Sequence, residues 1–263
     1  MRGVLGSDGL RVGPREKPRA SSLRDERLVD PNHPARNVSA TPAAIAFDVY
    51  GTLVDPLEMG ARLRPIAGEM ADRIAELWRT KQLEYSFRRA AMGAYRNFDE
   101  CTRQALDFAL RSFGVEVDDH EHARLLSSYR SLSPYPEAAQ ALWRLKQAGH
   151  AVVAFSNGVE ASLRELLAHA GLLEHLDGVV SVDNVRTFKP DPRVYQYLVQ
   201  RMERAPGDIW LVSSNPFDII GAKAQGLTAA WIKRNPRAIF DDWEFAPDLT
   251  ARDLADLAAR LSG

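Results

Sequence analysis

An aspartate, Asp48, directly follows the short apolar run 43–47, and a glycine, Gly51, comes three residues later. This pattern predicts a buried parallel strand whose carboxyl end carries one carboxylate into a crevice. Gly51 permits a sharp turn after the strand, so that the hydroxyl of Thr52 can point back toward the carboxylate. An aspartate after a strand also often begins a loop or caps a helix, and the rest of the chain has to decide between these roles.

Two further expected strands end in polar residues. Ser156 and Asn157 follow the apolar run 151–155, and the Ser-Ser-Asn cluster 213–215 follows the run 208–212. In an open parallel sheet, the carboxyl ends of the strands lie side by side at the ligand-binding crevice. Together the three polar ends therefore predict a site more sharply than the aspartate does alone.

A carboxylate in such a crevice can act as a nucleophile. It can attack carbon or phosphorus and form an ester that water later hydrolyses. Asp48 must be ionised to do so, and a nearby cation favours the ionised form. Lys189 follows an expected strand and precedes an expected helix, so it can reach the same crevice. A loop lysine by itself is more often solvated, but the rigid prolines Pro190 and Pro192 and the surrounding polar residues favour a functional role.

Helical and strand patterns alternate from Pro134 to the end of the chain. The expected helices cover 137–149, 160–170, 192–202 and 218–225, and the expected strands cover 151–155, 178–183, 208–212 and 228–232, the last strand of the chain. Strands separated by helices imply an α/β fold with a doubly wound parallel sheet.

The segment between the first strand and Pro134 has no strand pattern. Four helical stretches follow Asp55, over 57–79, over 83–95, from a helix start at 97–100 to Gly114, and over 118–131. Four helices inserted directly after a strand, with no strand between them, indicate a separate helical module. We therefore expect a helical-bundle cap over residues 57–131 and a core made of residues 43–56 and 132–263.

Composition excludes several classes of function. The 263 residues suffice for one large domain or two small ones, and a net charge of −1 gives no reason to expect a nucleic-acid or membrane partner. Cys101 is the single cysteine, which excludes an intrachain disulfide or a cysteine-built zinc site and fits a reducing, cytoplasmic location. Residues 1–42 lack the apolar region of a secretory signal, and we expect them to be a disordered extension without a chemical role.

The motifs together resemble those of the haloacid dehalogenase superfamily. The resemblance spans about residues 43–260 and rests on Phe47-Asp48-Val49-Tyr50-Gly51-Thr52-Leu53, Ser156-Asn157-Gly158, Lys189-Pro190-Asp191 and Val212-Ser213-Ser214-Asn215 with Asp218. The stretch from Leu77 to Tyr85 is also similar to the cap of one branch, the L-specific type II (S)-2-haloacid dehalogenases. This resemblance implies a Rossmannoid core with an inserted cap, a small 2-haloalkanoic acid substrate, no cofactor and a homodimer.

The choice of branch has a physical argument. Phosphatases of the superfamily carry a general-acid aspartate two residues after the nucleophile, where this chain has Tyr50, and they hold Mg²⁺ with acidic groups near the last cluster, which here begins with Ser213. Mg²⁺ prefers carboxylate oxygens, and Asp48 with Asp218 alone makes a poor site. A halide leaves as an anion and needs neither a general acid nor a metal. A Mg²⁺-dependent phosphatase and a non-catalytic module that binds small carboxylates or proteins stay open as alternatives.

The resemblance also implies roles for individual residues. Asp48 displaces halide with inversion, and water then attacks the carboxyl carbon of the ester. The remaining candidates are Thr52, Ser213 and Lys189 for orienting the carboxylate, Asn215 and Asp218 for positioning Lys189 and water, Ser156 and Asn157 for the substrate carboxylate, Arg79 for taking the halide or steering the anionic substrate, Tyr50, Leu83, Phe98 and Phe217 for an apolar wall, and Tyr195 for support. Thr80, where related sequences often have glutamine, and Pro216 depart from the pattern and bear on substrate size.

Overall fold

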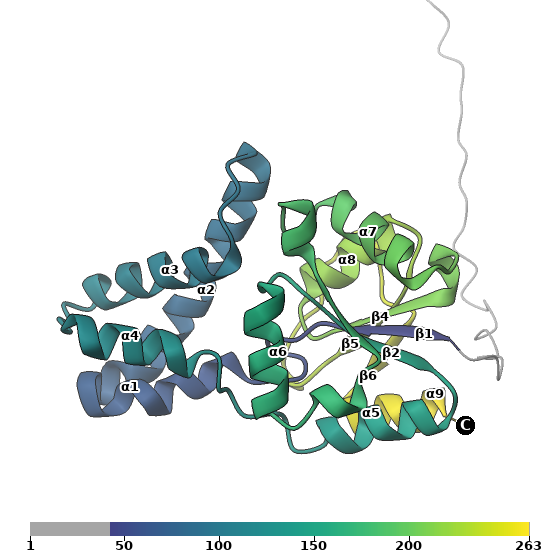
Figure 1. Cartoon of the computed structure of the whole chain (residues 1–263), viewed down its shortest axis with the longest axis horizontal. Coiled ribbons are helices and arrows are strands. Elements are labelled where there is room, and N and C mark those ends of the chain that lie inside the picture. The colour runs from purple at the N-terminus through teal and green to yellow at the C-terminus, as the bar shows by residue number, and fades with distance from the viewer. Residues whose placement is uncertain (1–42, 263) are drawn as a thin grey trace, which may run out of the picture. The chain divides into compact units, whose positions relative to one another are not determined.

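A computed structural model describes residues 43–262 of the chain. The extension expected over residues 1–42 lies outside the described residues. The described part contains one six-stranded sheet in which all neighbouring strands are parallel, with the order β3-β2-β1-β4-β5-β6 (Figure 1). The strands are β1 (Ala44–Phe47), β2 (Ala151–Ser156), β3 (Gly178–Ser181), β4 (Ile209–Ser213), β5 (Thr228–Ile232) and β6 (Leu249–Ala251).

The first strand lies in the middle of this sheet. All four residues of β1 are buried, as expected for a strand covered on both faces. Phe47 is in register with Ala154 of β2 and with Val212 of β4, so the residues that follow these positions meet at one edge. The doubly wound α/β architecture predicted from the sequence is confirmed.

Helices cover both faces of the sheet. Figure 1 shows α5 and α9 on one face and α7 and α8 on the other. The helices of this part are α5 (Ala138–Gln147), α6 (Glu160–His169), α7 (Pro192–Met202), α8 (Pro216–Ala224) and α9 (Leu254–Leu261), with short 3-10 turns at Leu173–His175, Val182–Val185 and Pro206–Asp208. Pro216 occupies the first turn of α8, where a missing N–H costs no hydrogen bond.

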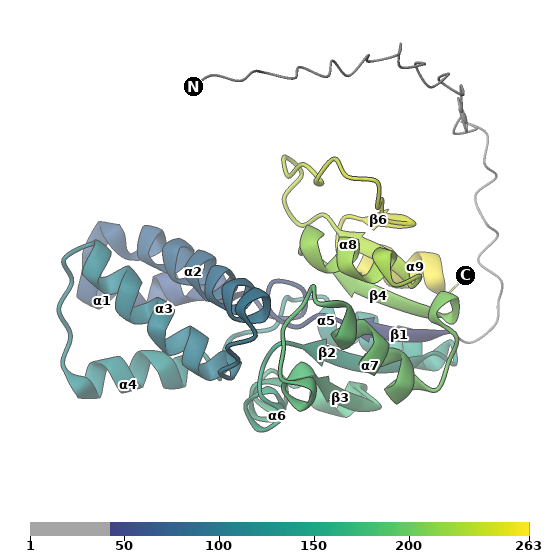
Figure 2. The same ribbon diagram turned by 90° about the horizontal axis from the view of Figure 1, so that it is seen from above.

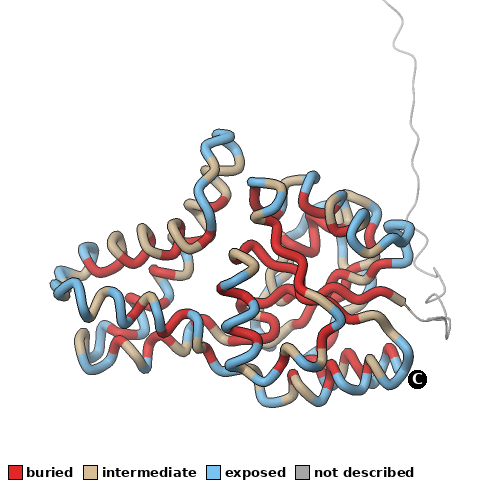
Figure 3. Tube along the Cα trace, viewed as in Figure 1, coloured by how far each residue is buried: buried red, intermediate tan, exposed pale blue. Residues whose placement is uncertain are grey.

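Four α-helices between β1 and α5 gather at one side of the sheet (Figures 1 and 2). They are α1 (Met59–Ala67), α2 (Ala71–Met92), α3 (Phe98–Ser112) and α4 (Asp119–Ser128), with 3-10 turns at Pro56–Glu58 and Gly68–Met70. We call this segment, residues 57–131, the cap, and its exact limits stay a prediction. Figure 3 shows that its helices alternate between buried and exposed positions, as amphipathic helices do.

Several predicted boundaries are wrong. The break expected between residues 79 and 83 does not exist, because nothing there interrupts the helix and α2 continues to Gly93, a left-handed residue with φ 62°. The break lies instead at Gly68, with φ 52°. The expected last strand, β5, is followed by β6 and α9, and β6 has only three residues, too few to give a periodic pattern.

The cap has its own packed interior. Trp78 of α2 is 1% exposed, and its indole Nε1 donates a hydrogen bond of 2.8 Å to the carbonyl of Thr102 in α3. Cys101, the residue before Thr102 in α3, is also buried, and burial raises the pKa of the Cys101 thiol to about 11. The thiol is therefore protonated at neutral pH and serves as core packing.

Candidate active site

A tight turn presents the carboxylate of Asp48 at the end of β1. The Asp48 amide donates to the carbonyl of Val212 at 2.9 Å, which continues the pairing of β1 with β4 by one residue. Gly51 follows with φ 89°, a conformation that favours glycine. The turn returns Thr52 toward Asp48, as the sequence predicted.

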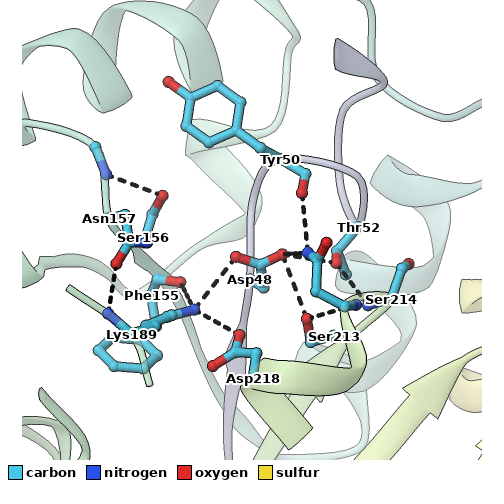
Figure 4. Close-up of polar contacts among 12 residues, drawn as sticks. Asp48, Tyr50, Thr52, Phe155, Ser156, Asn157, Lys189, Ser213, Ser214 and Asp218 are labelled. Atoms are coloured by element: carbon cyan, nitrogen blue, oxygen red, sulfur yellow. Dashed lines mark hydrogen bonds and ion pairs between the residues drawn. The ribbon is translucent and has the colours of Figure 1, made fainter. Parts of the chain in front are cut away.

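The two carboxylate oxygens of Asp48 have different partners (Figure 4). Oδ2 accepts hydrogen bonds from Thr52 Oγ1 at 2.9 Å and from Asn215 Nδ2 at 2.8 Å, with Ser213 Oγ at 3.4 Å. Oδ1 has one partner among the described residues, the ammonium of Lys189 at 3.2 Å. Oδ2 is thus held in place, whereas Oδ1 keeps a lone pair for chemistry.

Lys189 is the buried cation of the site. Its side chain is 1% exposed, and its Nζ donates to Asp48 Oδ1, to Asp218 Oδ2 at 2.7 Å and to the carbonyl of Phe155 at 2.8 Å. The ammonium also lies 4.2 Å from the centre of the Phe155 ring. The peptide bond to Pro190 is cis. The predicted approach of Lys189 to Asp48 is what the structure shows.

Asp218 is fully buried behind the lysine. Its Oδ1 accepts a hydrogen bond of 2.8 Å from the hydroxyl of Tyr195 on α7. The pKa of Asp218 is raised to about 6, chiefly by burial and also by the charge of Asp48, against the lowering effect of Lys189 and Tyr195. Burial and the same two carboxylates raise the pKa of the Tyr195 hydroxyl, which stays protonated as a donor.

The loop after β4 is tied to the Asp48 turn. The amide of Ser214 donates to Thr52 Oγ1 at 2.9 Å, and the amide of Asn215 donates to Ser213 Oγ at 3.1 Å. Asn215 Nδ2 also reaches the carbonyl of Tyr50 at 3.2 Å. These bonds fix the three donors that face Asp48 Oδ2.

The two candidates at the end of β2 are buried. Ser156 Oγ accepts a hydrogen bond from the amide of Gly158 at 3.3 Å, and Asn157 Oδ1 accepts one from the amide of Lys189 at 2.9 Å (Figure 4). The Asn157 side chain thus holds the lysine loop, and its amide nitrogen is the end left for a substrate. The predicted carboxylate-binding role of both residues stays a prediction.

Arg79 comes to the site from the cap. Its Nη2 donates to the carbonyl of Tyr50 at 3.2 Å, and its Nη1 donates to Gln82 Oε1 at 2.7 Å. The Tyr50 carbonyl therefore accepts from Arg79 and also from Asn215, which itself holds Asp48. The structure brings the predicted cap arginine to the turn that carries the carboxylate.

Aromatic rings surround Tyr50. Its ring centre lies 5.7 Å from that of Phe98 and 5.5 Å from that of Tyr129. Burial raises the pKa of the Tyr50 hydroxyl, which is therefore neutral. Tyr50, Thr102 and Tyr129 contribute to the lining of a cavity of about 260 Å³ beside the turn.

The other two residues of the predicted apolar wall lie on α2 and α8. Phe217 packs edge-on against Phe87 of α2, with ring centres 5.0 Å apart. Leu83 is half-buried one turn beyond Arg79 on α2. Thr80, one of the two departures from the family pattern, is exposed. The wall therefore includes a direct contact between the cap and the core.

Sequence reasoning missed four residues around this site. They are Gln82, Phe87, Tyr129 and Arg234. The signal for Gln82 was its position three residues after Arg79 on a helix, a spacing at which side chains meet. The other three come close through tertiary packing alone, and no local pattern marks them.

The charged groups form a compact set. Two carboxylates share one buried ammonium, and a guanidinium approaches from the cap. Within residues 43–262, no three His, Cys, Asp or Glu side chains cluster closely enough to hold a metal ion. The same part of the chain contains no helix long and apolar enough to span a membrane. The arrangement suits nucleophilic attack by Asp48 Oδ1, followed by hydrolysis in which negative charge would develop on Oδ2.

This fold and site define a class of enzyme. A family model described as haloacid dehalogenase-like hydrolase matches residues 42–226, and the chain belongs to this family.

Relatives within the family are named more narrowly. (S)-2-haloacid dehalogenase 1 of Pseudomonas sp. (strain CBS-3) is 42% identical over 204 residues, which are 78% of this chain and 89% of that protein. (S)-2-haloacid dehalogenase of Pseudomonas fluorescens is 38% identical over 212 residues, 81% of this chain and 93% of that protein. The solved L-2-haloacid dehalogenase of Xanthobacter autotrophicus, with chloropropionic acid covalently bound, is 34% identical, with a TM-score of 0.79 over 85% of this chain and 99% of that one.

Proposed function

We propose that this protein is an (S)-2-haloacid dehalogenase that hydrolyses short L-2-haloacids to D-2-hydroxy acids without a metal. The observation that carries the proposal is the unequal hydrogen bonding of Asp48, with one oxygen held by donors and the other beside Lys189 alone. Several similar proteins carry this name, and one was solved with chloropropionic acid covalently bound. An ester on Asp48 is the covalent species that this geometry supports.

The first step forms the ester. Asp48 Oδ1 donates an electron pair to C2 of the haloacid, and the carbon–halogen bond breaks with its electrons leaving on the halide. Attack from the side opposite the halogen inverts C2. The halide leaves as an anion, so this step requires no proton and no general acid. Lys189 holds Oδ1 toward the substrate.

The second step hydrolyses the ester. Water attacks Cγ of Asp48 and passes a proton to Asp218, and the negative charge of the tetrahedral intermediate gathers on Oδ2. Thr52 and Asn215 already donate to that oxygen, which makes them preorganised stabilisers. The intermediate collapses as Asp218 returns its proton to the departing alkoxide. The second water proton ends in solvent, and Asp48 is an ionised carboxylate again.

The substrate's other groups require their own partners. We assign its carboxylate to Ser156 and the amide of Asn157, and the departing halide to Arg79. Tyr50, Leu83, Phe98 and Phe217 form the apolar wall around C2 and its alkyl substituent. Tyr195 acts from behind, through Asp218.

The test measures halide release from L- and D-2-chloropropionate in the presence of EDTA. We expect the wild type to release chloride from the L isomer alone and Asp48→Ala to release none, with circular dichroism confirming that the variant is folded. Release from neither isomer would reject the proposal for this substrate class. A screen of phosphate esters with Mg²⁺ would then examine the phosphatase alternative.

We also propose that the protein acts in the cytoplasm as a homodimer. The single buried cysteine is compatible with a reducing compartment, and the dimer rests on the family resemblance. Light scattering coupled to size-exclusion chromatography measures the assembly: twice the chain mass supports the dimer, and the mass of one chain rejects it.

A further inference from the structure

We infer that Gln82 is a positioning residue that orients Arg79 and keeps its positive charge available for an anion in the site. The inference rests on the proposed function, in which Arg79 receives the departing halide. It adds a role to a residue for which the sequence motif itself suggested none.

Gln82 is a buried polar residue in the middle of α2. The residue is 0% exposed and lies one helical turn after Arg79. Its Oε1 accepts hydrogen bonds from Arg79 Nη1 at 2.7 Å and from the hydroxyl of Tyr129 at 2.9 Å. With two donors, this buried amide oxygen has its hydrogen-bonding capacity satisfied. Arg79 is therefore bound to a buried, fixed acceptor and not to a mobile surface side chain.

Thr102 settles which end of the Gln82 amide faces Arg79. The hydroxyl of Thr102 donates its only proton to the carbonyl of Phe98 at 2.8 Å. Thr102 Oγ1 can then only accept, and the group 2.6 Å away must be the NH₂ of Gln82. The amide oxygen consequently faces Arg79 and Tyr129. The chain from Phe98 through Thr102 to Gln82 thus fixes the acceptor before any ligand arrives.

The neutral amide leaves the charge of Arg79 unpaired. No carboxylate in the described part of the chain forms an ion pair with Arg79, and its second hydrogen bond goes to another neutral acceptor, the carbonyl of Tyr50. A guanidinium has five N–H donors, so two such bonds leave others for an anion. A carboxylate at position 82 would instead pair with Arg79 and reduce its attraction for a halide or a haloacid.

A double-mutant cycle tests whether Gln82 acts through Arg79. Gln82→Met has a similar length and cannot accept from the guanidinium. We expect it to lower kcat/KM for L-2-chloropropionate by about 10- to 150-fold, since a hydrogen bond to a charged group contributes on the order of 1.5–3 kcal/mol. In an Arg79→Ala background the same substitution should lower kcat/KM by less than about 3-fold, since interacting residues are not additive. An equal factor in both backgrounds would mean a merely structural role and overturn the inference.

A further variant and a control separate the orientation of Arg79 from the availability of its charge. Gln82→Glu keeps an acceptor beside Arg79 but adds a negative charge, and we expect KM to rise while kcat changes less. An unchanged KM contradicts the charge argument. Ser86→Ala is the matched control, because Ser86 is buried one turn further along α2 and donates only to the carbonyl of Leu83. A fall in activity for Ser86→Ala as large as that for Gln82→Met also overturns the inference.

A binding measurement makes the result independent of turnover. Asp48→Asn removes the nucleophile, and calorimetric titration with L-2-chloropropionate then gives Kd with and without Gln82→Met. We expect weaker binding in the double variant, and little change when Arg79→Ala is already present. If the wild type releases no chloride, the proposed function fails while this coupling still decides the role of Gln82. Undetectable binding by Asp48→Asn rejects that role.

Discussion

The carboxyl group of Asp218 combines a charge with complete burial, and this sets how the site responds to pH. Its raised pKa, about 6, comes first from the loss of solvent and then from the nearby charge of Asp48. The ionised form is the one that pairs with Lys189 and can accept a proton from water. Activity is therefore expected to fall as the pH decreases through about 6.

The same ionisation has the opposite effect on folding. The native state favours the protonated form of Asp218, because its pKa there lies above the ordinary value of 3.8. This contribution to stability is fully present below the ordinary value and is lost as the pH rises through about 6. Stability and activity thus change in opposite directions across this window.

Replacement of Tyr195 by phenylalanine should move the acid limb of the activity profile. The tyrosine hydroxyl donates to Asp218 and lowers its pKa. Without that donor the pKa rises, so the acid limb of kcat/KM against pH should shift to higher pH. Tyr197→Phe is the control, because this tyrosine, on the same helix, contacts Asn184 instead. A limb that does not move would show that Asp218 is not the group that titrates.

At the scale of elements, close packing of α7 against α8 positions the Tyr195 hydroxyl. Gly221 of α8 lies directly against the tyrosine ring, and a Cβ atom at this glycine would lie 2.7 Å from Tyr195 Cζ. That distance is far shorter than a van der Waals contact. The glycine is therefore required for the approach of the two helices.

Gly221→Ala should reduce stability and activity together. The added methyl group must displace the Tyr195 ring or separate the helices, and overpacking of this kind costs about 1–3 kcal/mol. Urea unfolding and halide release measure the two effects. Gly207→Ala is the matched control, because a Cβ atom there would meet no other atom within 4 Å. Full activity in Gly221→Ala would show that Tyr195 needs no such exact placement.

The sequence predicted the structure best where the pattern lies within a single strand, helix or turn. The buried run before Asp48 and the turn at Gly51 predicted β1 and its carboxylate correctly, because both depend on neighbouring residues. The helix break near residue 80 was wrong, since hydrophobic spacing alone does not separate one long helix from two short ones. The strand β6 was missed because it has only three residues.

At the scale of the whole molecule, Arg234 joins three segments that are far apart in the sequence. Its guanidinium donates to the carbonyl of Thr52 and to Glu137 Oε1 at 2.9 Å, and it stacks 3.3 Å from the centre of the Tyr135 ring. It therefore supports the Asp48 turn through the carbonyl of Thr52. Contacts of this kind, between residues 52 and 234, leave no local sequence pattern, which is why sequence reasoning did not find Arg234.

Arg234→Lys should weaken both folding and catalysis. Lysine keeps the charge, but its ammonium lacks the planar fork that serves an ion pair, a carbonyl and a ring at once. We expect a loss of about 1–3 kcal/mol in the free energy of unfolding and a lower kcat, because the carbonyl released belongs to Thr52. Arg237→Lys, an exposed arginine nearby, is the control. If both variants unfold at the same urea concentration, the contacts of Arg234 do not contribute to stability as described.

With Asp48 as the proposed nucleophile, its unequal hydrogen bonding also determines which oxygen atom each product receives. Oδ2 stays anchored by Thr52 and Asn215, so the oxygen that departs in each 2-hydroxy acid is the one beside Lys189. The oxygen supplied by solvent then takes that same place. In water enriched in heavy oxygen, the first product consequently carries an ordinary oxygen taken from the protein. Every later product carries a heavy oxygen, and Asp48 never holds more than a single labelled atom.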